Sequence, residues 1–97
     1  MTKVVNLKKE KYDVYIGRSS IFGNPYTHLP IEKTKAGVQV KNRNEAIEKY
    51  REYFYDRIEN DQEFLDEVLR LKDKVLACYC APKACHGDVI AEFLNKL

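Results

Sequence analysis

The sequence predicts a small α/β domain, a sheet with helices packed on it, that ends in a strand, a Cys-x-Cys turn and a helix. Three observations predict this class. Short runs of β-branched and aromatic residues near the N-terminus are typical of strands. Apolar residues recur at helical spacing between residues 42 and 69. A nearly continuous apolar run at residues 74–80 then precedes a helical apolar stripe at the C-terminus.

Length and composition restrict the chain to one domain. Its 97 residues, 44% of them hydrophobic, suffice for one core but are too few for two parts that each fold alone, so residues 1–97 are expected to form a single α/β domain. The 17 basic residues nearly cancel the 15 acidic ones, and the formal net charge is +2. The net charge therefore does not indicate nucleic-acid binding. Nucleic acid could still be a partner through a local basic surface.

The sequence carries no recognisable targeting signal. No apolar run approaches the roughly 20 residues that a membrane span needs, and residues 1–4 lack the apolar stretch of a signal peptide. We therefore expect a cytoplasmic protein without a membrane partner. In a reducing compartment, the 3 cysteines, which cluster within residues 78–85, are more typical of metal binding or reactivity than of disulfide bonding.

The N-terminal half predicts two short strands and a long loop. Strands are expected at residues 3–7 and 13–16, where β-branched and aromatic residues cluster. Residues 17–30 carry Gly, Ser, Asn and Pro repeatedly, which predicts an ordered loop. Residues 31–40 are compatible with a small hairpin or with a mobile excursion.

The C-terminal half predicts three helices and one strand. Asn42 with Glu45, and Asn60 with Glu63, have the spacing of helix N-caps and precede apolar residues at helical intervals. Residues 74–80 are expected to form the central strand of the sheet. A last helix covers this strand and carries the apolar residues Val89, Ile90, Phe93, Leu94 and Leu97.

The chemistry of the chain is concentrated in residues 78–88, where the central strand meets the last helix. On a strand, Cys78 and Cys80 point to the same face. Cys85 and His86 fall at the helix start, where backbone amides and the helix dipole would stabilise a thiolate at Cys85. We therefore expect a reactive or ligand-binding turn.

Two charged residues complete this segment. Lys83 adds positive charge that suits either a thiolate of low pKa or an anion subsite. Asp88 is expected to cap the helix by accepting a hydrogen bond from a backbone amide.

Three interpretations of the cysteines and the histidine remain open. In the first, Cys80, Cys85 and His86 form a catalytic site with a cysteine thiolate and a histidine that carries the proton. In the second, Cys78, Cys80, Cys85 and His86 bind zinc, although the adjacent Cys85 and His86 must diverge strongly to reach one ion. In the third, Cys78 is simply a buried core residue.

A second candidate site is the loop at residues 17–25. It follows a predicted strand, supplies small residues for close approach, and includes a guanidinium that suits phosphate or carboxylate. The expected ligand-binding residues are Gly17, Arg18, Ser19, Gly23 and Asn24, with Lys83 and Asp88 from the other segment. In the alternative, Asn24 caps the backbone of a structural turn and Arg18 pairs with a carboxylate. His28 is expected to be a surface histidine, or a metal ligand or base if the loop folds over the cysteines.

The two segments together carry a family resemblance. The Gly-Arg-Ser and Gly-Asn-Pro strings of residues 17–25, joined with the Cys-Tyr-Cys-Ala-Pro-Lys and Cys-His-Gly-Asp strings of residues 78–88, resemble the bacterial and phage family called domain of unknown function 4326. The resemblance runs from Val4 to about Leu94, and residues 31–40 look like a local insertion. It strengthens the assignment of the site but implies no activity. A weaker similarity to a second group, with a Cys-His pair after a buried strand, implies that Cys80, Cys85 and His86 form the shared site.

Two functional hypotheses follow from these residues. The first is an enzyme or ligand-binding domain for a nucleotide-like or other phosphate-bearing molecule, with Arg18 and the loop amides holding the anion. The second is a zinc-binding module that mediates contact with nucleic acid or with a protein. A phage-encoded interaction protein, which would need an exposed apolar patch, is a third class.

Overall fold

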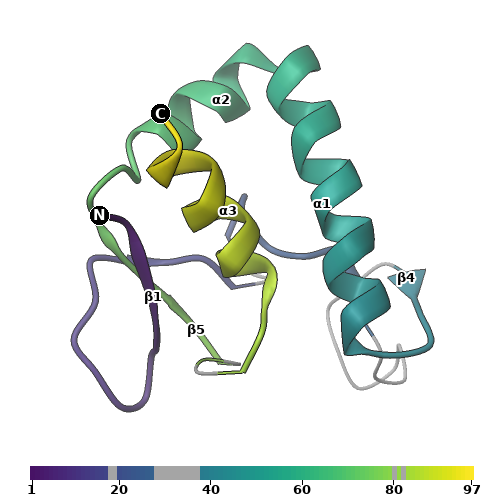
Figure 1. The fold of residues 1–97 in the computed structure, drawn as a ribbon, viewed down its shortest axis with the longest axis horizontal. Coiled ribbons are helices and arrows are strands. Elements are labelled where there is room, and N and C mark those ends of the chain that lie inside the picture. Colours follow the sequence, from purple (N-terminus) through teal and green to yellow (C-terminus); the bar gives the residue numbers. More distant parts are fainter. Residues whose placement is uncertain (18–19, 28–37, 80, 82) are drawn as a thin grey trace.

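The computed structural model describes residues 1–17, 20–27, 38–79, 81 and 83–97. Along the chain lie β1 (Lys3–Asn6), β2 (Val14–Tyr15), β3 (Tyr26–Thr27), β4 (Val38–Gln39), α1 (Arg43–Asn60), α2 (Gln62–Leu69), β5 (Val75–Cys78) and α3 (His86–Asn95). Figure 1 shows α3 beside β1 and β5, with α1 on its other side. The predicted α/β class, with a strand, a turn and a helix at the C-terminal end, is confirmed.

The main sheet has three strands in the order β1-β5-β2, and both pairings are parallel. The apolar run of β5 therefore forms the central strand, as the sequence predicts. Asn6 stands opposite Cys78, and Tyr15 stands opposite Ala77. Because all three strands run the same way, their carboxyl ends lie at one edge, which we call the carboxyl edge.

A two-stranded parallel ladder of β3 and β4 lies outside this sheet and contacts α1. Of the segment at residues 31–40, residues 31–37 lie outside the described part of the chain. Residues 38–39, in β4, pair in parallel with β3. The hairpin considered for residues 31–40 stays a prediction, because one of its two strands would fall in residues 31–37.

Side-chain caps set the starts of α1 and α2. The side chain of Asn42 accepts a hydrogen bond of 2.9 Å from the backbone of Glu45 and begins α1, as predicted. The predicted cap at Asn60 is wrong. Asn60 is the last residue of α1 and donates back to the carbonyl of Asp56, whereas the extended residue Asp61 accepts from Phe64 and begins α2. A carboxylate is favoured there because the start of a helix is positive.

The helices and the sheet share one hydrophobic core. The ring of Phe54 on α1 lies 5.8 Å from that of Phe64 on α2 and 5.6 Å from that of Phe93 on α3. From the sheet, Leu76 and Cys78 are buried in the same cluster. Cys78 is therefore a core residue, as one interpretation of the sequence predicts.

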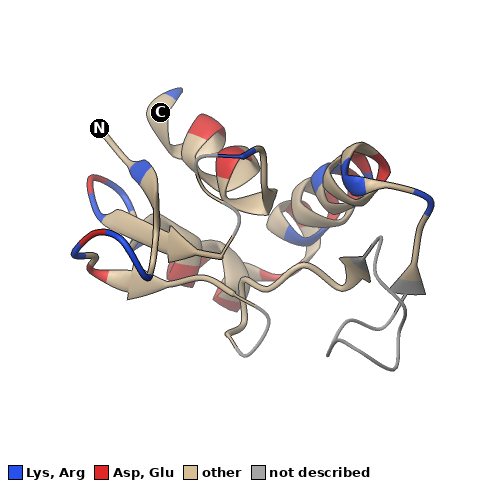
Figure 2. Ribbon diagram, turned by 90° about the horizontal axis from the view of Figure 1, so that it is seen from below, with Lys and Arg blue, Asp and Glu red and all other residues tan. Residues whose placement is uncertain are grey.

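The surface carries mixed charge. Figure 2 shows Lys and Arg interleaved with Asp and Glu along the helices and in the loop that joins β1 to β2. Such alternation is typical of a solvated face. Among the described residues, no helix combines the length and the hydropathy that a membrane span requires.

Candidate functional site

Three strand ends and one helix start meet at the carboxyl edge. Asn6 ends β1, Ile16 and Gly17 follow β2, and Cys78 ends β5. The helix α3 begins at His86 and contacts both β1 and β5. The described parts of the two predicted sites therefore lie at the same edge of the sheet.

The side chain of Asn6 holds the turn that leaves β5. Its Nδ2 donates hydrogen bonds to the carbonyl oxygens of Tyr79, at 3.1 Å, and Ala81, at 2.9 Å. Its Oδ1 accepts from the backbone of Lys8 at 2.9 Å. One amide thus fixes both the cysteine turn and the loop after β1. Sequence reasoning missed this residue, because nothing next to it in the chain distinguishes it from any other asparagine at the end of a strand.

Two of the three cysteines face each other in the core. The Sγ atoms of Cys78 and Cys85 lie 3.0 Å apart and share a hydrogen bond in which either thiol can donate. Both residues are buried, at 2% and 3% exposure. The pair joins the end of the central strand to the residue that precedes α3.

The predicted stabilisation of a thiolate at Cys85 is wrong for this arrangement. The hydrogen bond with Cys78, and next the burial of the thiol, raise the pKa of Cys85 far above its ordinary value. The backbone amide of Gly87 acts in the opposite direction, as expected at a helix start, but it is outweighed. Cys85 is accordingly a neutral thiol at neutral pH.

His86 links the helix start to the loop after β2. Its Nε2 lies 2.6 Å from the carbonyl oxygen of Ile16. Because a carbonyl only accepts, Nε2 carries a proton and donates it. The imidazole is buried at 8% exposure, and its ring lies 5.1 Å from that of Tyr50 in an edge-to-face arrangement. The described contacts therefore orient His86 rigidly, and its catalytic role stays a prediction.

The remaining residues of the Cys-His-Gly-Asp string build the start of α3. Asp88 accepts a hydrogen bond of 3.1 Å from the backbone of Cys85, which confirms the predicted cap. Gly87 allows close approach to the sheet, since a Cβ there would lie 2.8 Å from the Cδ1 of Ile16 and 3.0 Å from a methyl group of Val4. Lys83 is exposed, and its part in binding an anion stays a prediction.

The second segment is a tight turn in its described part. The hydroxyl of Ser20 donates to the carbonyl of Gly17 at 2.7 Å, and Gly23 donates its amide to the carbonyl of Ser20 at 3.1 Å. Asn24 is buried at 6% exposure. Its Nδ2 donates to the carbonyl of Ala46 and its Oδ1 accepts from the backbone of Tyr26, at 3.1 and 2.8 Å. These bonds match the alternative in which Asn24 caps the backbone.

Several predicted residues lie outside the described part of the chain. They are Arg18, Ser19, His28 and Cys80. Among the residues that are described, no three His, Cys, Asp or Glu side chains gather in a way that could hold a metal ion. The zinc alternative therefore depends on Cys80 and is not tested by the described residues.

An exposed aromatic pair also lies at the carboxyl edge. Tyr79 is 61% exposed, and its ring lies 6.2 Å from that of Tyr15 in an edge-to-face arrangement. The ammonium of Lys8 lies 5.7 Å from the centre of the Tyr79 ring. Neither tyrosine was predicted as a site residue. The position of Tyr79 between two cysteines is the one feature of the sequence that sets it apart.

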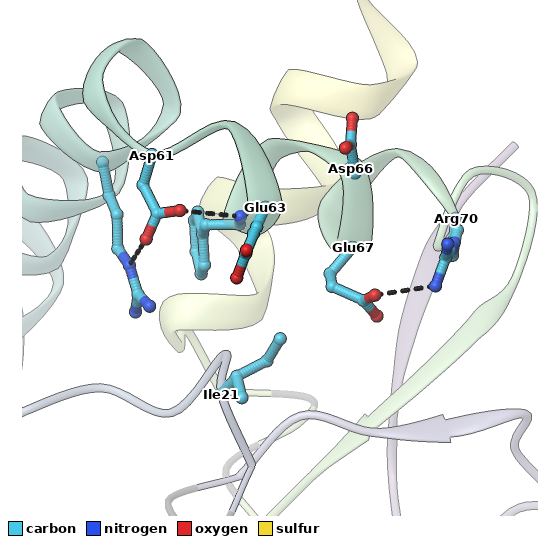
Figure 3. A pocket seen from close by; sticks show the side chains of 8 residues that line it. Ile21, Asp61, Glu63, Asp66, Glu67 and Arg70 are labelled. Atoms are coloured by element: carbon cyan, nitrogen blue, oxygen red, sulfur yellow. Dashed lines mark hydrogen bonds and ion pairs between the residues drawn. The ribbon is translucent and has the colours of Figure 1, made fainter.

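A shallow hollow of about 350 Å³ lies along α2 and the end of α1, and Ile21 of the loop after β2 contributes to it. Its lining consists of Ile21, Arg57, Asp61, Glu63, Phe64, Asp66, Glu67 and Arg70. Figure 3 shows Glu67 paired with Arg70, and Asp61 paired with a guanidinium, which is that of Arg57. It contains none of the residues that the sequence predicts as site residues.

Comparison with known proteins agrees with the resemblance seen in the motifs. The model of the family described as domain of unknown function 4326 matches residues 2–96. The chain belongs to this family. It is also 33% identical over 97 residues to an uncharacterised 12.4 kDa protein encoded in the nrdA-td intergenic region of Enterobacteria phage T4, covering 100% of this chain and 81% of the phage protein. No solved structure matches the chain.

Proposed function

We propose that the carboxyl edge of the sheet binds a small phosphate-bearing molecule of nucleotide-like type. The observation that carries this proposal is the 2.6 Å contact between His86 and the carbonyl of Ile16. This contact holds the first residue of α3 against Ile16. The loop that begins at Gly17 follows Ile16 directly in the chain. Ligands of parallel sheets lie beyond the carboxyl ends of the strands, and the start of a helix offers backbone amides to an anion.

Each part of the edge has a role in this proposal. Arg18 and the amides of the loop at residues 17–24 hold the phosphate, with the exposed Lys83 adding charge. Asp88 acts indirectly, because its carboxylate caps the helix through Cys85. If the domain is an enzyme, Cys80, Cys85 and His86 are the groups that react. Among these groups, Cys85 is poorly suited to attack a substrate, because its thiol is buried and its pKa is raised. Its favoured role is to support the start of α3 at the binding site.

Calorimetric titration with inorganic phosphate, ribose 5-phosphate and adenosine monophosphate at one fixed salt concentration tests the proposal. The variant Arg18→Ala should weaken binding about tenfold or more, since a hydrogen bond to a charged group contributes about 1.5–3 kcal/mol. Arg70→Ala is the matched control, because Arg70 follows α2 and its guanidinium pairs with Glu67. Absence of binding by all three probes, or equal affinity of Arg18→Ala, Cys85→Ser and the unchanged protein, contradicts the proposal.

A second candidate function is zinc binding through Cys78, Cys80, Cys85 and His86. One observation favours it: two thiols from different elements already approach to 3.0 Å. His86 would have to ligate through Nδ1, because Nε2 is bonded to Ile16. Elemental analysis of the purified protein separates the candidates. The zinc module is supported if the protein contains stoichiometric zinc and if Cys85→Ser both loses the zinc and unfolds. A folded protein that contains no metal rules the zinc module out.

A further inference from the structure

We propose that Cys78 and Cys85 form a reversible dithiol–disulfide couple that links the end of β5 to the start of α3. This is a modification site, and it does not depend on the proposed phosphate ligand. The evidence is the 3.0 Å separation of the two Sγ atoms, which come from two elements that the fold holds in fixed positions.

The geometry requires only a small movement. Sulfur atoms in a disulfide are about 2.05 Å apart, so an approach of about 1 Å closes the bond. Cys78 is fixed by the ladder that pairs it with Asn6, and Cys85 is fixed by the hydrogen bond from its amide to Asp88. Two thiols held in this way react with each other at a high effective concentration, which favours the disulfide.

Burial favours the same product. Both thiols lie in an apolar cluster, where a charged thiolate is disfavoured. A disulfide carries no ionisable group, so oxidation replaces two thiols by a neutral bond that suits this environment. In a reducing compartment such a bond is transient, as expected of a redox-sensing pair.

The step is balanced with a peroxide as the oxidant. Because both thiols are buried and neutral in the folded protein, one of them first becomes exposed by local opening and loses its proton. Its thiolate attacks an oxygen of hydrogen peroxide, the O–O bond breaks, and hydroxide leaves and takes up that proton. The second thiol then attacks the sulfenic sulfur, the S–S bond forms, the S–O bond breaks, and water leaves. The two sulfurs lose two electrons together, and the peroxide is reduced to two molecules of water.

Formation of the Cys78–Cys85 disulfide should change the start of α3 at the carboxyl edge. Cys85 immediately precedes α3, and closure draws its sulfur toward Cys78. The next residue is His86, whose ring contacts Ile16. Oxidation should therefore change the exchange of the first amides of α3 while the amides of α1 keep theirs.

The experiment uses the intact protein, reduced, desalted and treated with hydrogen peroxide. We expect the titratable thiols of the denatured protein to fall from 3 to 1, with a loss of two hydrogen atoms in mass and recovery on adding dithiothreitol. Trypsin should release residues 75–83 joined to residues 84–96. The variant Cys80→Ser is the matched control, because it keeps the proposed pair and should form the same link.

The variants Cys78→Ser and Cys85→Ser should not form this link. If either variant is too unstable to purify, Cys80→Ser is sufficient to test the proposal. Its two remaining cysteines are Cys78 and Cys85, so a disulfide within one molecule must join them. Loss of the link in Cys80→Ser, links between two molecules, sulfinic acid in place of a disulfide, or bound zinc that protects the thiols would each overturn the proposal.

Discussion

Asn6 donates a hydrogen bond of 2.9 Å to the carbonyl oxygen of Ala81 and so ties the end of β1 to the turn after β5. A second bond from the same amide holds the carbonyl of Tyr79. The far end of this turn is fixed separately, by the cap between Cys85 and Asp88. The cysteine segment is thus anchored at both ends by side chains that carry no reactive chemistry.

The variant Asn6→Ala removes this anchor. We expect a loss of about 1–3 kcal/mol in the free energy of unfolding, because the partly buried hydrogen bond to the carbonyl of Ala81 is lost. Denaturant unfolding measures the loss, and hydrogen exchange should show faster exchange after β5. The control is Asn60→Ala. Among the described residues the exposed side chain of Asn60 bonds to Asp56, so this variant should change stability by less than about 0.5 kcal/mol. Equal effects of the two variants would contradict the anchoring role of Asn6.

Gly87 lets α3 approach the sheet closely. A Cβ at this position would lie 2.8 Å from the Cδ1 of Ile16. Gly87→Ala should therefore destabilise the protein by about 1–3 kcal/mol, more than the gain in helix propensity of about 1 kcal/mol can offset. In an Ile16→Val background, which lacks the nearest atom, the same substitution should cost less. A double-mutant cycle measures this coupling. Additive effects would show that the contact with Ile16 does not limit the approach.

Tyr50 joins the helix α1 to the loop before β3. Its buried hydroxyl donates to the carbonyl of Phe22 at 2.8 Å. Tyr50→Phe keeps the ring but leaves that carbonyl without its donor, so we expect a loss of about 1–2 kcal/mol in unfolding free energy. Tyr12→Phe is the matched control, because Tyr12 is 45% exposed. A neutral Tyr50→Phe would mean that water replaces the lost donor.

The sequence was sufficient where structure is decided locally. The Asn42 cap, the apolar run of β5 and the stripe of α3 depend on residues that are near one another in the chain, and all three were predicted correctly. The error at Asn60 is also local. Asn60 and Asp61 are both good capping residues, and the extended backbone of Asp61, with φ of −134°, together with its negative charge, distinguishes them.

Contacts between distant segments could not be predicted in this way. Asn6 and Ala81 are 75 positions apart, and His86 and Ile16 are 70 positions apart. Neither contact leaves a periodic or spacing signal in the sequence. The pKa of Cys85 was mispredicted for the same reason, because the helix start is visible in the sequence whereas the thiol of Cys78 beside it is not.

The thiol of Cys85 should make stability depend on alkaline pH. Its pKa is raised in the folded protein, by the bond with Cys78 and then by burial, above the ordinary value of 9.0. The unfolded chain therefore loses this proton first as pH rises. Stability from this group is present below about pH 9 and falls above it, by at most about 1.4 kcal/mol per pH unit.

Unfolding free energies of the reduced protein between about pH 7 and pH 10 test this dependence. Within that window the raised pKa of Tyr50 contributes little, because the ordinary value for tyrosine is 10.0. Cys85→Ala should start from a lower stability and lose less of it as the pH rises. Cys80→Ala, which keeps the buried pair, should retain the slope of the unchanged protein. An equal slope in Cys85→Ala would show that the buried thiol pair does not hold its protons more tightly than the unfolded chain does.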